Sequence, residues 1–270
     1  MNETRNDQTA DGGSDGAPLL RLERVSKSFG AVQALVDVNF DVRSGEVTAL
    51  IGDNGAGKSV LIKCIAGIHS PDGGQIYWQG EPVRIRAPRD AAALGIDTVY
   101  QDLALCDNLD IVENMFLGRE LKHRGMLDEA RMETMARDAL KSLSVRTVTS
   151  VRQTVSSLSG GQRQTVAIAK SVLWNSEVVL LDEPTAALGV AQTRQVLDLV
   201  RRLADQGVGV VLISHNMVDV FEVADRICAL YLGRVAADVE TTEITRSQVV
   251  ELITAGRSRS ARRLPRATAS

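Results

Sequence analysis

Cysteine and aromatic residues are scarce in this chain, and long apolar runs are missing. The three cysteines of the 270 residues stand at 64, 106 and 228, which matches neither a disulfide framework nor a metal-ligand motif. No run of about eighteen apolar residues occurs, which argues against a membrane-spanning helix. The start of the chain is polar and has no apolar segment typical of a signal peptide. These absences favour a protein of the reducing cytoplasm.

A large excess of charge of one sign is also missing. The net charge of −3 argues against broad nucleic-acid binding, and no nucleic-acid partner is expected. A hydrophobic content of 44% is ample for the core of one large α/β domain, predicted here for residues 18–255. We expect residues 1–17 to be a disordered tail and 256–270 to be a basic tail. The basic tail is expected in solvent, and contact with anionic lipid headgroups is the alternative.

What the chain does contain is a glycine-rich loop of the kind that binds phosphates. An apolar run at Val47–Ile51 predicts a buried strand, and apolar residues at helical spacing follow from Leu61. Between them Gly52 and Gly57 are separated by four residues, and a Lys-Ser pair follows, which is the phosphate-loop pattern. Backbone N–H groups and a helix N-terminus would face the phosphates there. The loop reads Gly52, Asp53, Asn54, Gly55, Ala56, Gly57, Lys58, Ser59.

Two acidic residues, Asp182 and Glu183, follow a second buried strand, predicted at the four apolar residues Val178–Leu181. Carboxyl ends of parallel strands are where doubly wound sheets bind ligands. We expect Asp182 and the Ser59 hydroxyl to hold Mg²⁺, Lys58 to reach the β- and γ-phosphates of ATP, and Glu183 to act as general base on the attacking water. A strand that merely ends in solvated acids is the alternative.

A third strand, predicted at Val208–Ser214, ends beside His215. A histidine at such a strand end can hydrogen-bond a γ-phosphate and orient water, so His215 is the second candidate catalytic residue. A structural histidine with no catalytic role is the alternative. A final helix is predicted from Ala191 to Leu203.

These motifs, together with a Leu-Ser-Gly-Gly-Gln run at 158–162, resemble the ATP-binding cassette (ABC) ATPase family over roughly residues 19–255. The resemblance implies a signature motif at 158–162, whose Ser159, Gly160, Gly161 and Gln162 cap the γ-phosphate held by a second copy of the chain. It implies that Gln101 contacts Mg²⁺ and senses the γ-phosphate. It also implies that Phe29 stacks on adenine, the alternative being a half-buried strand aromatic. The active form would then be a nucleotide-sandwich dimer.

Two departures from the family pattern stand out. Val60 follows Ser59 where the family usually has Ser or Thr, so Mg²⁺ ligation falls to Ser59. The loop after Glu183 ends in Gly189 where many members have Asp, which puts close coupling of the two ATP sites in doubt. The same loop, with Glu113–Glu120 and Ile213–Met217, is similar to ATPases of bacterial monosaccharide importers of the ribose, xylose and fructose type. This chain has one cassette and resembles their single-cassette branch.

The expected fold is α/β, a P-loop NTPase with a mainly parallel core sheet, a small antiparallel β subdomain and a helical subdomain at about residues 102–165. Strands are predicted for the antiparallel sheet, and a helix capped by Asp128 is predicted within the helical part. Asn108–Gly118 would line the groove for a permease helix, although Met115, Phe116 and Leu117 could equally be core. The antiparallel strands are predicted at 19–29, 36–42, 75–78 and 83–85.

The resemblance implies the ATP-hydrolysing subunit of a bacterial ABC importer, with a monosaccharide as the expected cargo. Its partners would be a membrane permease dimer and, indirectly, an extracytoplasmic sugar-binding protein, so the chain would sit at the cytoplasmic face of the membrane. The alternatives are an ABC ATPase of another transporter, including an exporter, and a soluble ATPase acting on ribosomes or DNA. A single cassette and the short spacing between the phosphate loop and the signature disfavour the soluble alternatives.

Overall fold

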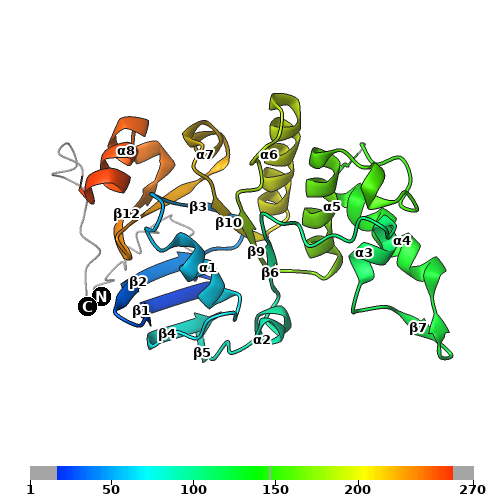
Figure 1. Ribbon diagram of the computed structural model, residues 1–270, viewed down its shortest axis with the longest axis horizontal. Coiled ribbons are helices and arrows are strands. Elements are labelled where there is room, and N and C mark those ends of the chain that lie inside the picture. The colour runs from blue at the N-terminus through cyan, green and yellow to red at the C-terminus, as the bar shows by residue number, and fades with distance from the viewer. Residues whose placement is uncertain (1–16, 146, 258–270) are drawn as a thin grey trace, which may run out of the picture.

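Six strands form the main sheet in the order β12-β11-β3-β10-β9-β6 (Figure 1). This computed structural model describes residues 17–145 and 147–257. All neighbouring strands are parallel except β12, which pairs antiparallel with β11. The mainly parallel core sheet is therefore confirmed. The strands are β3 (Val47–Gly52), β6 (Ile96–Val99), β9 (Val178–Asp182), β10 (Gly209–Ile213), β11 (Arg226–Tyr231) and β12 (Arg234–Glu240).

The second sheet is antiparallel and lies below the main sheet in Figure 1. Its order is β2-β1-β4-β5, and helix α1 (Lys58–Ile65) lies between the two sheets. The predicted strand at 83–85 is placed too late, because β5 ends at Val83 and the chain then turns toward α2 (Pro88–Ala93). The strands are β1 (Leu20–Phe29), β2 (Val32–Val42), β4 (Gly73–Trp78) and β5 (Glu81–Val83).

Alternate residues of the main strands face two separate apolar cores. Leu50, Leu180 and Ile213 point toward α1 and the antiparallel sheet. Ala49 and Leu181 point the other way, toward α6 (Val190–Asp205), α7 (Met217–Val223) and α8 (Arg246–Ala255). Because these strands are buried on both faces, they appear in the sequence as continuous apolar runs.

Helices α7 and α8 correct the prediction that the helix near Ala191–Leu203 is the last one. That helix is α6, and it extends to Val190–Asp205. Helix α7 has only seven residues, which is about two turns, so its apolar pattern is too short to stand out. It begins after Asn216, whose side chain accepts a hydrogen bond from Val218 N at 3.0 Å.

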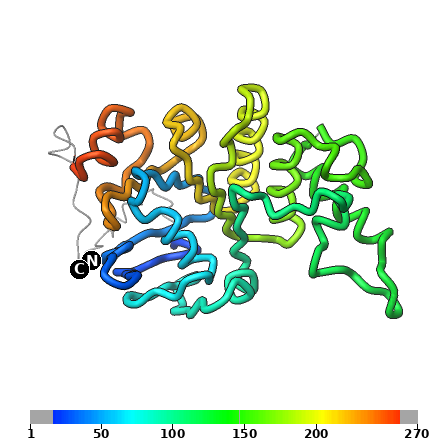
Figure 2. Tube along the Cα trace, in the orientation of Figure 1, coloured from blue at the N-terminus to red at the C-terminus, as the bar shows by residue number. Residues whose placement is uncertain are grey.

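The helical part projects at one end of the molecule, opposite α8 (Figure 2). Helices α3 (Ile111–Phe116), α4 (Glu129–Ser142) and α5 (Gly160–Leu173) pack together there, beside a hairpin of β7 (Lys122–His123) and β8 (Met126–Leu127). Asp128 caps α4 as predicted, accepting from Arg131 N at 3.2 Å. Two 3₁₀ turns, Val155–Ser157 and Thr241–Glu243, complete the elements.

The apolar core of the helical part is continuous with the core above the main sheet. Met115 and Phe116 are completely buried in it, whereas Leu117 is 46% exposed. Of the three residues considered for a partner groove, two are therefore core and one faces outward. That residues 102–165 form a subdomain remains a prediction. The predicted tails, 1–17 and 256–270, lie almost entirely outside the described residues.

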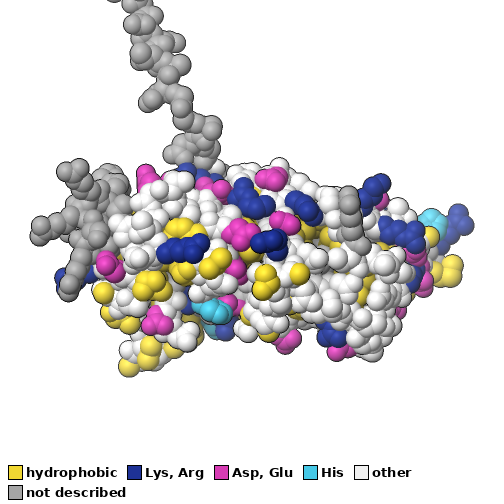
Figure 3. Space-filling view, turned by 90° about the horizontal axis from the view of Figure 1, so that it is seen from above, with side chains coloured by type: hydrophobic (Ala, Val, Ile, Leu, Met, Phe, Trp, Pro, Cys, Tyr) yellow, Lys and Arg dark blue, Asp and Glu magenta, His cyan; other side chains and the backbone are white. Residues whose placement is uncertain are grey.

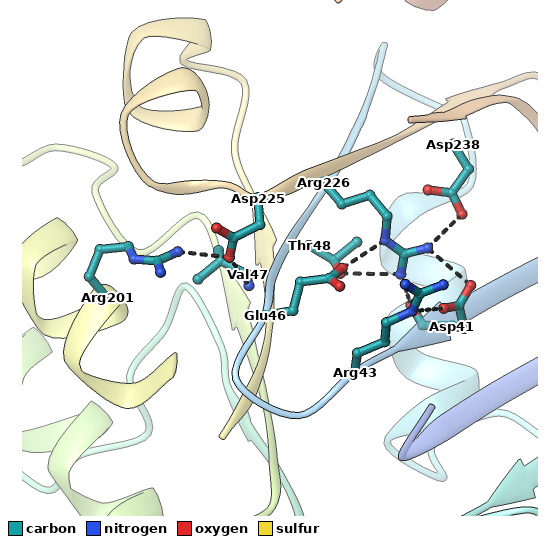
Figure 4. Close-up of polar contacts among 9 residues, drawn as sticks. All are labelled: Asp41, Arg43, Glu46, Val47, Thr48, Arg201, Asp225, Arg226 and Asp238. Carbon is teal, nitrogen blue, oxygen red and sulfur yellow. Dashed lines mark hydrogen bonds and ion pairs between the residues drawn. The ribbon is translucent and has the colours of Figure 1, made fainter. Parts of the chain in front are cut away.

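A buried arginine, Arg226, links residues from early and late parts of the chain at one edge of the main sheet (Figure 4). Arg226 on β11 donates to Glu46 Oε1 at 2.7 Å, to Asp41 Oδ1 at 3.0 Å and to Asp238 Oδ2 at 3.0 Å. Burial raises the pKa of the Asp238 carboxyl to about 6, although the Arg226 charge acts in the opposite direction. Removing one member of such a group would leave buried charge unpaired.

The surface seen from above Figure 1 mixes charges of both signs (Figure 3). Lys and Arg side chains lie among Asp and Glu side chains on this face. Within the described part of the chain, no helix has both the length and the apolarity needed to cross a bilayer.

Candidate functional site

The phosphate-binding loop joins β3 to α1, as the sequence predicts. Gly57 has a φ of +105° and immediately precedes the helix. A Cβ atom at this position would lie 2.7 Å from the Ala34 carbonyl oxygen, and one at Gly52 would lie 2.6 Å from the Leu230 carbonyl oxygen. Only glycine fits these two positions, because the backbones of β2 and β11 approach the loop too closely for a side chain.

The Lys58 ammonium lies across the loop that precedes it. Its Nζ donates to the Gly52 carbonyl at 2.7 Å and to the Asp53 carbonyl at 3.1 Å. Ala56 N donates to the Asp53 carbonyl at 3.1 Å and closes the turn. Gly55 has a φ of +80°, and nothing lies within 4 Å of its Cβ position. The loop is therefore open on the side where a Gly55 side chain would stand.

Two carboxylates stand at the carboxyl end of β9 beside this lysine. Burial raises the pKa of Asp182, and the charge of Glu183 raises it further. Burial lowers the pKa of Lys58, while Glu183, Asp53 and Asp182 act in the opposite direction. Because the pKa of Asp182 is raised, a cation bound beside it would stabilise its ionised form.

Glu183 and His215 are brought together from neighbouring strands. Glu183 Oε2 lies 2.7 Å from His215 Nδ1, and the Glu183 side chain is mostly buried whereas that of His215 is 76% exposed. Glu183 has a positive φ of +52°, and its N–H donates to the Ile213 carbonyl at 3.0 Å. Such a backbone conformation in a non-glycine residue is costly and clusters at functional sites.

One cavity of about 390 Å³ brings together Lys58, Glu183 and His215, whereas Asp182 is not among its lining residues. Its walls come from the phosphate loop, the ends of β9 and β10, and helices α7 and α8. Prediction from sequence missed three of its lining residues, Ser214, Met217 and Ile253. Asn216 followed by apolar residues was the available signal for a helix near Met217, whereas nothing local in the sequence indicates that Ile253 lies here. The lining residues are Gly52, Asp53, Asn54, Lys58, Glu183, Ser214, His215, Met217 and Ile253.

The expected magnesium ligands are all oxygen donors. Ser59 is the second residue of α1, directly after Lys58. Asp182 ends β9, and Gln101 lies in an exposed bend after β6. A hydroxyl, a carboxylate and an amide oxygen are hard ligands that suit Mg²⁺, which keeps water in its other positions. The residues therefore fit this ion. Val60 cannot ligate it, and its side chain instead packs against the core below the main sheet.

Phe29 lies at the end of β1 and is 44% exposed. Its ring makes an edge contact with His69 at a centroid distance of 5.1 Å, and Lys27 Nζ lies 5.5 Å from its centroid. The ring is therefore not core, and it offers an exposed surface on which a base can stack. Adenine stacking on Phe29 remains a prediction.

The Ser-Gly-Gly-Gln run forms the start of helix α5, with Ser159 as its N-cap. Ser159 Oγ accepts from Gln162 N at 3.3 Å, and Gln162 Oε1 accepts from Ser159 N at 2.9 Å. This reciprocal capping box leaves Gly160 and Gly161 at the helix N-terminus. A Cβ at Gly161 would lie 3.0 Å from Gln192 Cβ on α6, so the glycine also permits close packing of the two helices.

The signature residues do not reach the cavity of their own chain. None of the described residues 158–162 lines the cavity beside Lys58. Figure 1 places α5 and α1 apart, with β9 and β6 between them. The chain thus carries a phosphate-binding loop and a separate helix N-terminus suited to an anion.

Comparison with protein families gives a match to the model described as ABC transporter, over residues 35–186. The fructose import ATP-binding protein of Rhizobium meliloti is 47% identical over 244 residues, which cover 88% of this chain and 94% of that protein. The xylose/arabinose import ATP-binding protein of Sulfolobus acidocaldarius is 45% identical over 236 residues, covering 87% and 94%.

Solved structures give the same fold. A nucleotide-free ATP-binding cassette from an ABC transporter superposes with a TM-score of 0.75 at 25% identity, covering 87% of this chain and 98% of that one. A dimeric cassette in a post-hydrolysis state, bound to ADP and Pi, superposes with a TM-score of 0.68 at 26% identity, covering 82% and 98%.

Proposed function

This chain belongs to the ABC transporter family of ATPases, and from that premise we propose that it powers the import of a monosaccharide across a bacterial membrane. The observation that carries the ATPase part is the cavity that Lys58, Glu183 and His215 line together. The importer part is supported by two relatives, named for fructose import and for xylose/arabinose import, that match nearly their whole length.

ATP is bound by the β3–α1 loop in this proposal. The loop N–H groups and the α1 N-terminus receive the phosphates, and the Lys58 ammonium moves from the loop carbonyls to the β- and γ-phosphates. Phe29 supports the adenine ring. Ser59, Asp182 and Gln101 hold Mg²⁺, which neutralises phosphate charge when bound.

Hydrolysis then depends on two residues of this chain. Glu183 accepts a proton from the attacking water as general base, and its partly buried carboxylate faces the cavity. His215 lies 2.7 Å from that carboxylate and orients the water and the γ-phosphate. Glu183 has a positive φ, a conformation that clusters at functional sites.

The active unit is a dimer of two copies. Ser159, Gly160 and Gly161 of one copy cap the γ-phosphate held by the other, so each ATP lies between two chains. The dimeric cassette with ADP and Pi supports this arrangement, as does the distance between the phosphate loop and the signature within one chain. Gly189, in place of an acidic residue, implies weaker coupling between the two sites.

Closure and reopening of this dimer drive a permease dimer in the membrane. The chain binds at the cytoplasmic face of the permease, through the segment Asn108–Gly118 that contains α3. An extracytoplasmic sugar-binding protein delivers the sugar to the permease, so it acts on this chain only indirectly. Leu117 at the end of α3 and the β7–β8 tip, with Met126 72% exposed, supply apolar contact surface.

The test is to purify the tagged chain gently from membranes of its host and to identify its partners. Recovery of a multi-span permease, followed by loss of labelled-sugar uptake in a deletion strain, is the expected result. Recovery of ribosomes or only soluble partners would overturn the transport role while leaving the ATPase role intact. Loss of sugar efflux instead of uptake would reassign the chain to an exporter.

A further inference from the structure

A buried carboxylate outside the predicted site connects the two loops that carry Glu183 and His215. Asp219 lies in the first turn of α7 and is 4% exposed. The Thr185 hydroxyl donates to its Oδ2 at 2.7 Å, and Asn216 Nδ2 donates to its Oδ1 at 2.9 Å. Each carboxylate oxygen therefore binds a different loop.

The Thr185 side of this connection leads directly to Glu183, two residues earlier. The turn that contains both residues is tight, because Ala186 N donates to the Glu183 carbonyl at 3.1 Å. Glu183 also keeps its positive φ within this turn. Backbone conformations of this kind persist only when their surroundings hold them, and the bond from Thr185 to Asp219 fixes the end of the turn.

The Asn216 side leads to His215, the preceding residue. Asn216 N donates to Ser214 Oγ at 3.1 Å, and its side-chain oxygen accepts from Val218 N. With its amide group also bound to Asp219, the Asn216 side chain has partners for both its oxygen and its nitrogen. The backbone on the carboxyl side of His215 is thus held in one position.

We propose that Asp219 is a positioning residue that fixes the distance between the Glu183 turn and the His215 turn, and so sets the rate of ATP hydrolysis without contributing to ATP affinity. The inference rests on the proposed roles of Glu183 and His215. The carboxylate accepts from both neighbours, and both hydrogen bonds are charge-assisted. An amide that kept its oxygen on Asn216 would turn its N–H groups toward Thr185, whose hydroxyl would have to rotate to accept, and both bonds would become neutral and weaker.

A purely structural acid would behave differently. An aspartate in the first turn of a helix stabilises the helix through its dipole alone. Loss of that interaction lowers the thermal midpoint but leaves the hydrolysis rate of the folded protein unchanged. A variant that hydrolyses ATP more slowly while its Kd for ATP is unchanged therefore indicates a positioning role. A variant with only a lower thermal midpoint indicates a structural role.

The experiment compares Thr185→Val, Thr185→Ser and Asp219→Asn in the full chain, at concentrations where ATP produces the dimer. We expect Thr185→Val and Asp219→Asn to slow single-turnover hydrolysis about 10-fold, with the Kd for ATP within about 2-fold of wild type. Thr185→Ser keeps the hydroxyl and retains the rate. Thr134→Val is the matched control, because it removes a threonine hydroxyl that binds the Ala130 carbonyl on α4, in the helical part.

Non-additivity provides the second readout. Because both changes break the same bond, the double variant Thr185→Val/Asp219→Asn should hydrolyse ATP no more slowly than Asp219→Asn alone. Wild-type rates in Thr185→Val, equal losses in Thr185→Val and Thr185→Ser, or additive losses in the double variant would each overturn the inference. Should Asp219→Asn fail to fold, the comparison of the two Thr185 variants still decides.

Glu183→Gln is measured alongside to separate this inference from the function on which it rests. Loss of turnover in Glu183→Gln, with normal rates in the Thr185 and Asp219 variants, refutes only the positioning role. Near-normal turnover in Glu183→Gln refutes the proposed role of Glu183 and with it the basis of the inference.

Discussion

The Glu183 carboxylate lies 2.7 Å from His215 and faces the cavity that Lys58 also lines. These three side chains come from three different loops, at the ends of β9, β10 and β3. Their roles at the residue scale differ. Lys58 is proposed to bind ATP, and the other two are proposed to act only during hydrolysis.

Replacing Glu183 by glutamine should abolish turnover while ATP stays bound. The amide keeps the size of the side chain but cannot accept a proton, so the rate should fall about 10²- to 10⁴-fold. Phosphate release measures the rate, and nucleotide retained after gel filtration measures trapping of the ATP-bound dimer. Turnover near wild type would remove Glu183 as the base.

Replacing Lys58 by alanine should act earlier, on binding. The lysine supplies charge-assisted hydrogen bonds to phosphate, each worth about 1.5–3 kcal/mol, so the Kd for ATP should rise at least about 10-fold. Nucleotide titration measures this change. Lys141, an exposed lysine in the last turn of α4, is the matched control, and Lys141→Ala should bind ATP normally. An unchanged Kd in Lys58→Ala would contradict the assignment of the loop.

At the scale of elements, the site depends on strands that the Arg226 group holds together. This arginine connects β11 to β12, to the end of β2 and to the residue before β3, as Figure 4 shows. Strand β3 leads into the phosphate loop, and β11 approaches Gly52 closely. The ion pairs of Arg226 thus help to hold β3 and β11, the two strands beside the phosphate loop, in position.

The pH dependence of stability should report on Asp238 in this group. Its pKa is raised to about 6 in the folded protein, from an ordinary value of 3.8, so the folded state binds more protons than the unfolded state between these pH values. The contribution of Asp238 to the free energy of unfolding therefore falls as pH rises from about 4 to about 6.

The Asp238→Asn variant isolates this contribution, because the asparagine does not titrate. The difference in free energy of unfolding, wild type minus variant, should decrease as the pH of urea denaturation rises from 4.5 to 7. A difference that stays constant across this range, or that increases with pH, would contradict a raised pKa at Asp238.

At the scale of the whole molecule, we propose that the chain contains one half of each of two ATP sites. The phosphate loop lies beside α1 and the signature lies at the start of α5, with β9 and β6 between them in Figure 1. In this proposal a second copy completes each site. Mutations in the signature should affect assembly and leave ATP binding by the single chain intact.

Replacing Ser159 by arginine should prevent the ATP-dependent dimer. The long cationic side chain would replace the capping hydroxyl at the α5 N-terminus, where the second copy's phosphates would approach. Light scattering with ATP measures the dimer, and nucleotide titration confirms that the Kd for ATP is kept. Ser142→Arg, at the last residue of α4, is the control and should dimerise normally. A normal dimer in Ser159→Arg would contradict the sandwich.

Much of the site could be predicted because its residues stand in short local patterns. The glycines of the phosphate loop, the apolar run before Asp182 and the capping box at Ser159 each indicate their structure within ten residues of sequence. Helices α7 and α8 could not be predicted in the same way. Helix α7 is too short for a clear period, and Ile253 reaches the cavity only because α8 packs against β11 and β3.

The sequence by itself was enough to predict the phosphate loop, the buried strands that precede Asp182 and His215, and the family. These depend on local backbone geometry, which a few neighbouring residues dictate. Only the tertiary structure decided that Glu183 contacts His215 and that Asp219 binds Thr185 and Asn216. Glu183 and His215, like Thr185 and Asp219, are more than thirty positions apart in the sequence. The parallel pairing of β9 with β10 brings them together.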